Sequence, residues 1–199
     1  AFVGKREGLP LIAVSHRPFD PRFFGGRPLI FQVRDPRDVC VSAYFHETRH
    51  KQRFNGDISA FIEDEQRGIP AIIAYHNGWA APVAKGPSVV VSYEEMSEDT
   101  ASAVTRILEF LGLDVDQAAL ASAIEKARFD QMKKNEKKTG IPGHEYDRSD
   151  DESLRVRKGK VGGYEEYLSD ANVDRVLQLC REGLSPEGRR LMAHTGLDL

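Results

Sequence analysis

The sequence predicts an α/β domain with a central parallel sheet flanked by helices. Three short apolar runs of strand length lie at residues 9–15, 29–33 and 88–93, and helical patterns follow them along the chain. Strands that alternate with helices favour parallel pairing, because each helix returns the chain to the same edge of the sheet. The chain has 199 residues, which is enough to bury a substantial core, so we expect residues 1–199 to form a single domain.

Helical patterns occupy most of the chain beyond residue 36. One helix is expected to begin at Pro36, and the others at residues 57–67, 71–85, 100–110, 116–128, 170–181 and 186–194. The segments 18–28 and 136–153 are rich in Gly, Pro or charged residues, which predicts loops. The long helices carry apolar stripes and no chemical motif, so we expect them to serve as scaffold.

The turn between residues 33 and 36 predicts an anion site. Asp35 followed by Pro36 is a strong helix start, because Asp caps the helix and Pro has no N–H to leave unpaired. Arg34 therefore lies at the end of a strand and beside a helix N-terminus, and Ser42 follows two turns later. Both features attract anions. The alternative is an ordinary strand-to-helix turn with a solvated arginine.

Composition excludes some classes of function. The net charge of −3 argues against a nucleic-acid partner, since such domains are usually basic. Cys40 and Cys180 fall in separate helices, and we interpret both as buried thiols in a reducing compartment. No apolar run approaches the length of a membrane span and no signal peptide is visible, so we expect a cytoplasmic protein.

Five sequence blocks resemble those of the sulfotransferases that use 3′-phosphoadenosine 5′-phosphosulfate (PAPS). Residues 34–42, RDPRDVCVS, resemble the family's 3′-phosphate-binding segment, R-[ND]-P-[KR]-D-x-x-x-S. Residues 157–164, RKGKVGGY, are similar to R-K-G-x-x-G-[DE]-W, with Gly163 and Tyr164 in place of the acidic residue and the Trp. The other three blocks are VSHRP at 14–18, VVVSYEEM at 89–96 and FDQMKKN at 129–135, which resemble K-T-H-x-P, a strand ending in Y-E-[DE]-[ML], and the adenine-pocket segment F-x-x-M-[KR]-x-x. The blocks occur in the family's order and cover nearly the whole chain.

The resemblance implies a sulfotransferase fold of the P-loop nucleoside triphosphate hydrolase type. It also implies transfer of a sulfuryl group from PAPS to a hydroxyl or amine, with 3′-phosphoadenosine 5′-phosphate (PAP) as product and no metal. His16 would be the general base. The implied cofactor-binding residues are Arg34, Ser42, Tyr93, Phe129, Met132, Arg157, Lys158 and Gly159. The acceptor would be a small molecule, glycan, lipid or peptide.

Two departures from the family pattern are visible. The family's Lys two residues before the catalytic His is Val14 here. The family's loop P-K-[ST]-G-[ST]-[ST], which holds the 5′-phosphosulfate, is not found in the fifteen residues before His16. We therefore expect that the N-terminal part of the domain, with this loop, lies outside the sequence given. If the loop is truly missing, the alternative is a non-catalytic relative that binds 3′-phosphoadenosine nucleotides.

A rival motif lies in the helix after Pro36. His46-Glu47-Thr48-Arg49-His50 matches H-E-x-x-H, in which two His side chains bind zinc and the Glu acts as a general base. No Gly-x-x-His continues the pattern downstream, and the third ligand would be Glu63 or Glu65. A zinc hydrolase that uses His46, Glu47 and His50 is therefore the less favoured alternative.

Overall fold

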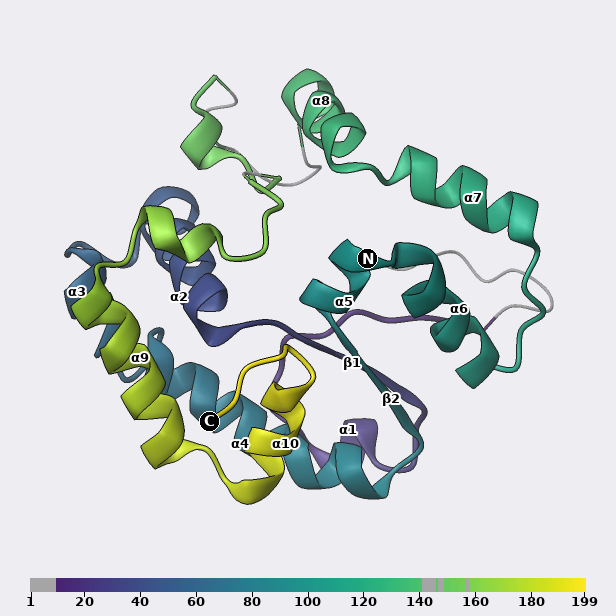
Figure 1. Cartoon of the computed structure of the whole chain (residues 1–199), viewed down its shortest axis with the longest axis horizontal. Helices are drawn as coiled ribbons and strands as arrows, with labels where there is room; N and C mark the ends of the chain where they lie inside the picture. Colours follow the sequence, from purple (N-terminus) through teal and green to yellow (C-terminus); the bar gives the residue numbers. More distant parts are fainter. Residues whose placement is uncertain (1–9, 141–145, 147–148, 157) are drawn as a thin grey trace.

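The centre of the fold is a parallel pair of strands, β1 (Leu29–Val33) and β2 (Ser88–Ser92). The structure, a computed structural model, describes residues 10–140, 146, 149–156 and 158–199. The register runs from Leu29 opposite Ser88 to Val33 opposite Ser92. In Figure 1 the two strands lie between α4, α9 and α10 on one side and α5 and α6 on the other. The predicted α/β class with a parallel sheet is confirmed.

Helices account for most of the remaining described chain. In order they are α1 (Pro21–Phe24), α2 (Pro36–Phe45), the π-helix η1 (His46–His50), α3 (Ile58–Ile62), α4 (Ile69–Lys85), α5 (Tyr93–Glu98), α6 (Thr100–Phe110), α7 (Gln117–Lys126), α8 (Phe129–Thr139), the 3₁₀ helices η2 (Asp151–Ser153) and η3 (Gly163–Glu166), α9 (Asp170–Gly183) and α10 (Pro186–Ala193). No helix in the described part of the chain is both long enough and apolar enough to cross a membrane.

The hydrophobic core joins the crossover between the strands to the C-terminal helices. Phe31 and Val33 of β1 are buried with Trp79 of α4, and α4 packs against α9 and α10. The prediction that Cys40 and Cys180 are buried is confirmed, and both thiols are free. Burial raises the pKa of each thiol to about 12, so neither is a reactive thiolate at neutral pH.

The predicted buried strand at residues 9–15 is wrong for the residues described there. Residues 10–15 have no regular structure, and Leu11, Ile12 and Val14 are exposed. An apolar run becomes a strand only when a neighbouring strand takes its backbone hydrogen bonds, and no described strand pairs with this one.

Some helix limits also differ from the prediction. The helix expected at 57–67 ends at Ile62, because the Asp64 carboxylate accepts the amides of Gln66 and Arg67 and holds a turn. Tyr93 opens α5 instead of closing β2, since Ser92 and Glu95 form a capping box at that point. The loop expected at 136–153 begins later, because α8 continues to Thr139.

We expect the buried residues where α3 packs against α2 to contribute strongly to the free energy of unfolding. Phe61 is fully buried, so Phe61→Ala should lower the free energy of unfolding by about 3–5 kcal/mol. Phe23 is 57% exposed, and Phe23→Ala is the matched control that should change it little. Urea unfolding measures both. Equal losses of unfolding free energy in the two variants would contradict the burial of Phe61.

Candidate functional site

The site begins at Arg34, where β1 ends and α2 starts. Asp35 caps α2 through the amide of Arg37, as its sequence predicted, and Pro36 occupies the first turn. The Arg34 guanidinium lies over the Tyr93 ring at 4.2 Å and donates to the Lys160 carbonyl at 3.1 Å. The Asp35 carboxylate already accepts an amide at the N-terminus of α2. The group that this turn offers to an anion is therefore the Arg34 guanidinium.

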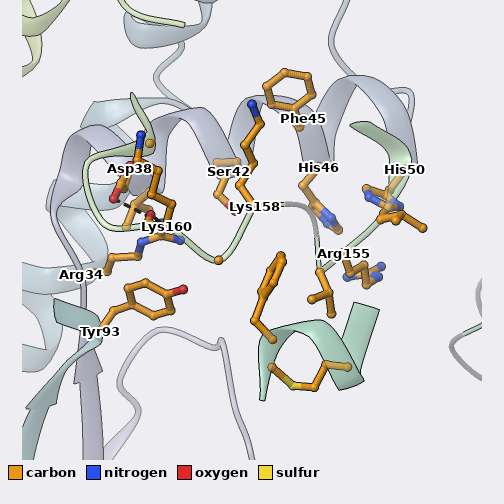
Figure 2. Close-up of a pocket in the computed structure, with 18 of the residues that line it drawn as sticks. Arg34, Asp38, Ser42, Phe45, His46, His50, Tyr93, Arg155, Lys158 and Lys160 are labelled. Carbon is orange, nitrogen blue, oxygen red and sulfur yellow. Dashed lines mark hydrogen bonds and ion pairs between the residues drawn. The ribbon is translucent and has the colours of Figure 1, made fainter. Parts of the chain in front are cut away.

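A cavity of about 740 Å³ opens beside Arg34. It is lined by residues from five separate stretches of sequence, and Figure 2 shows Arg34 and Tyr93 at one end and His46, His50 and Arg155 at the other. The predicted site residues that line it are His16, Arg34, Ser42, Tyr93, Phe129, Met132, Lys158 and Gly159. Arg157, the remaining predicted residue, lies outside the described residues. The structure therefore brings these eight predicted residues together around one cavity.

We use the name basic loop for the described residues 155, 156 and 158–164. One wall of the cavity is formed by six of them: Arg155, Val156, Lys158, Gly159, Lys160 and Gly163. Two buried carboxylates hold the loop. Asp38 of α2 accepts the amides of Gly162 at 3.0 Å and Tyr164 at 2.9 Å, and pairs with Arg34 at 3.2 Å. Glu136 of α8 accepts amides near the other end of the loop, as described below. The loop is thus fastened to two different helices.

Glu136 is buried at 4% exposure and accepts three hydrogen bonds, each of 2.7 Å. The donors are the amides of Arg155 and Val156 and the hydroxyl of Tyr146. Burial alone would raise the pKa of the Glu136 carboxyl, but these bonds outweigh it and hold the pKa below its ordinary value of 4.5. Glu136 is therefore ionised at neutral pH.

Gly159 lies where the basic loop meets the Phe129 ring. Its φ of +59° is left-handed, and a Cβ at this position would come within 2.1 Å of a Phe129 ring carbon. Only glycine allows the loop backbone to pass so close to the ring. Position 159 therefore requires glycine for two reasons: its left-handed backbone and its packing against the Phe129 ring.

Lys158 projects toward the cavity from the same loop (Figure 2). Its ammonium pairs with the Glu166 carboxylate and lies 5.1 Å from the centre of the Tyr167 ring. The hydrogen bond to Glu166 raises the pKa of Lys158 to about 12, so this residue is a permanent cation at neutral pH.

His16 is exposed and lines the cavity from the segment before α1. The neighbouring carbonyl of Arg17 accepts a hydrogen bond of 3.1 Å from the indole N–H of Trp79. Trp79 packs in turn against Phe19 and Phe24. This contact ties the segment that carries His16 to the hydrophobic core.

The HETRH motif forms the π-helix η1, with the His46 and His50 rings 5.6 Å apart. Glu47 is buried, and its carboxylate forms ion pairs with Arg53 at 2.7 Å and Arg67 at 3.6 Å. These ion pairs occupy the carboxylate that the zinc alternative requires as a general base. Burial lowers the pKa of His46, and the charge of Arg155 lowers it further. Within the described ranges, no group of three or more His, Cys, Asp or Glu side chains is placed to hold a metal ion. This geometry does not support the zinc alternative.

Several residues that hold or line the cavity do not follow from the sequence. Asp38 lies inside the block at residues 34–42, but the sequence predicts no role for it, and Glu136 falls in the segment predicted to be a polar loop. Arg155, His46 and His50 also line the cavity, where the sequence does not place them. No local signal marks Glu136, because its partners lie 10 to 20 residues away along the chain.

Comparison with known proteins identifies the family. The sulfotransferase domain family matches residues 12–196, which is nearly the whole chain. The chain belongs to the sulfotransferase family. The family expected from the five sequence blocks is confirmed.

Individual relatives are distant in sequence. Sulfotransferase 2B1 of Mus musculus is 28% identical over 183 residues, which covers 87% of this chain and 54% of the relative. Sulfotransferase 2A1 of Homo sapiens is 26% identical over 192 residues, covering 92% of this chain and 66% of the relative. A crystal structure of mouse sulfotransferase SULT7A1 complexed with PAP aligns with a TM-score of 0.64 at 26% identity, covering 83% of this chain and 62% of that one. The chain thus spans about half to two thirds of the length of these relatives.

The packing at Gly159 leads to a prediction about the basic loop. Gly162 has a similar left-handed φ of +73° but nothing within 4 Å of a Cβ. Gly162→Ala should therefore cost only the conformational strain, about 1–2 kcal/mol of unfolding free energy. Gly159→Ala should cost more, because the Phe129 ring must also move. Urea unfolding of both variants measures the difference, and equal losses would rule out the ring contact.

Proposed function

We propose that this sulfotransferase moves a sulfuryl group from PAPS to a hydroxyl or amine of a small-molecule acceptor. The observation that supports this most strongly is that eight separately predicted residues, from His16 to Gly159, line one cavity. The mouse relative described above is complexed with PAP, and 3-alpha-hydroxysteroid sulfotransferase of Cavia porcellus, 27% identical, is named for a hydroxyl-bearing acceptor.

The residues present fit a 3′-phosphorylated nucleotide. The Nε–H of Arg34 is buried and has no hydrogen-bond partner within the described part of the chain. A buried donor without an acceptor is costly, and a phosphate oxygen would satisfy it. Ser42 offers a hydroxyl donor from α2, and Lys158 adds a point charge from the basic loop. Tyr93, Phe129 and Met132 supply the flat and apolar surfaces that an adenine ring requires.

PAPS would supply the sulfuryl group, which is activated by its bond to phosphate. The chain's own task is then to place the acceptor and to remove its proton. An imidazole can accept a proton from an attacking hydroxyl, and we assign this role to His16, which is exposed and lines the cavity. Cationic donors around the cavity would stabilise the negative charge that gathers on oxygen during transfer.

Nucleotide binding is the first test. Calorimetric titration should show tighter binding of adenosine 3′,5′-bisphosphate than of ADP. Arg34→Ala should weaken bisphosphate binding about tenfold to hundredfold, since hydrogen bonds to charged groups contribute about 1.5–3 kcal/mol. Arg22→Ala, which removes an exposed arginine paired with Asp20, is the control and should leave the affinity unchanged. Equal affinity of the unaltered protein for ADP and the bisphosphate would contradict the phosphate site.

Transfer itself tests His16. His16→Ala should lower kcat about 10²–10⁴-fold with bisphosphate affinity unchanged, because a general base acts in the chemical step alone. His194→Ala, at the exposed end of α10, is the matched control. Near-normal turnover by His16→Ala would remove His16 from the mechanism. Nucleotide binding without transfer by the unaltered protein would favour the non-catalytic alternative.

A further inference from the structure

The basic loop is held in place by carboxylates that the proposed reaction does not use. Along its described residues, the loop is tied at the 155–156 end to Glu136 and at the 162–164 end to Asp38. The two carboxylates come from different helices, α8 and α2. Lys158 and Gly159 lie between the two attachments. The middle of the loop is therefore suspended between fixed points at the edge of the cavity.

Asp38 also fixes the opposite side of the site. One carboxylate oxygen accepts from Gly162 and pairs with Arg34, and the other accepts from Tyr164. Arg34 itself reaches the Lys160 carbonyl within the loop. One carboxylate thus sets the distance between the guanidinium and the loop. Figure 2 shows Asp38, Arg34 and Lys160 gathered at this end of the cavity.

Both carboxylates that hold the loop are buried, and burying a charged group costs free energy. Asp38 is 3% exposed and Glu136 is 4% exposed, and burying a charge is costly unless hydrogen bonds replace its water. Among the described residues, each carboxylate accepts hydrogen bonds from two backbone amides of the loop. Asp38 also forms an ion pair with Arg34, and Glu136 also accepts a hydrogen bond from the Tyr146 hydroxyl. The positions of these charges are matched to the backbone of the loop.

We propose that Asp38 and Glu136 are positioning residues that hold the basic loop ready for the 3′-phosphate. The inference rests on the proposed function for its ligand. A loop already ordered before binding spares the nucleotide the entropy cost of ordering it. The benefit should be confined to nucleotides that carry a 3′-phosphate, because the loop lies where that group would bind.

Asp38 allows a test that separates positioning from charge. Its negative charge lies beside a site for a phosphate, so electrostatics alone predicts that Asp38→Asn would tighten phosphate binding. Positioning predicts the reverse, because the asparagine amide group would oppose a backbone N–H and the loop would be released. We expect Asp38→Asn to weaken binding of adenosine 3′,5′-bisphosphate about tenfold and to leave ADP nearly unchanged.

Glu136 does not line the cavity, and it allows a graded test. Glu136→Gln keeps one acceptor oxygen for the loop amides, whereas Glu136→Ala removes both. We expect bisphosphate affinity to fall in the order unaltered protein, Gln variant, Ala variant. Glu47→Gln is the matched control, since Glu47 is a buried, ion-paired carboxylate whose partners Arg53 and Arg67 lie outside the loop.

Calorimetry with both nucleotides should be paired with amide hydrogen exchange in the absence of nucleotide. The proposal expects faster exchange at Gly162 and Tyr164 in Asp38→Asn, faster exchange at Val156 in Glu136→Ala, and a lower ratio of bisphosphate to ADP affinity in both. Tighter bisphosphate binding by Asp38→Asn, or an unchanged ratio despite faster exchange, would overturn it. Failure of the unaltered protein to bind the bisphosphate would overturn the proposed function and with it the phosphate role. Slow exchange at the three amides in the variants would instead overturn the attachment of the loop alone.

Discussion

The carboxylate of Asp38 is the interaction on which the cavity depends. It lies in the first turn of α2 and joins three parts of the chain: the helix that carries it, Arg34 after the end of β1, and the amides of the basic loop. The two loop amides lie 124 and 126 residues from Asp38 in the sequence. Without such a link, the strand-to-helix turn and the loop would be two separate basic features. With it, they face each other across one cavity.

The sequence predicted what local signals determine. Asp35 and Pro36 define the start of α2 by themselves, and the apolar run at residues 29–33 forms β1 because β2 pairs with it. The apolar run at residues 10–15 gave a wrong prediction. Its pattern fits a strand, but a strand forms only where a neighbouring strand takes its backbone hydrogen bonds. Glu136 could not be assigned from sequence, since nothing near it shows that a distant loop would supply its donors. Eight residues that line the cavity could therefore be predicted from the sequence, whereas the carboxylates that hold the loop could not.

The HETRH segment shows why a motif needs its backbone and its neighbours. The pattern assumes an α-helix with two free imidazoles and an available carboxylate. Here the segment is a π-helix that continues α2, and the carboxylate of Glu47 forms ion pairs with Arg53 and Arg67, which lie further along the chain. The histidines are left facing the cavity as lining groups. π-helical turns often occur beside functional sites, where they change the direction of side chains by a fraction of a turn.

The bond between Trp79 and the Arg17 carbonyl has a practical consequence. Trp79 is the chain's only tryptophan, and its indole N–H ends one residue away from His16. Indole emission shifts in wavelength when its N–H loses a partner or meets water. The protein therefore contains its own optical probe of the segment that carries His16. Rapid-mixing fluorescence could follow that segment in real time, with no label attached and no residue changed.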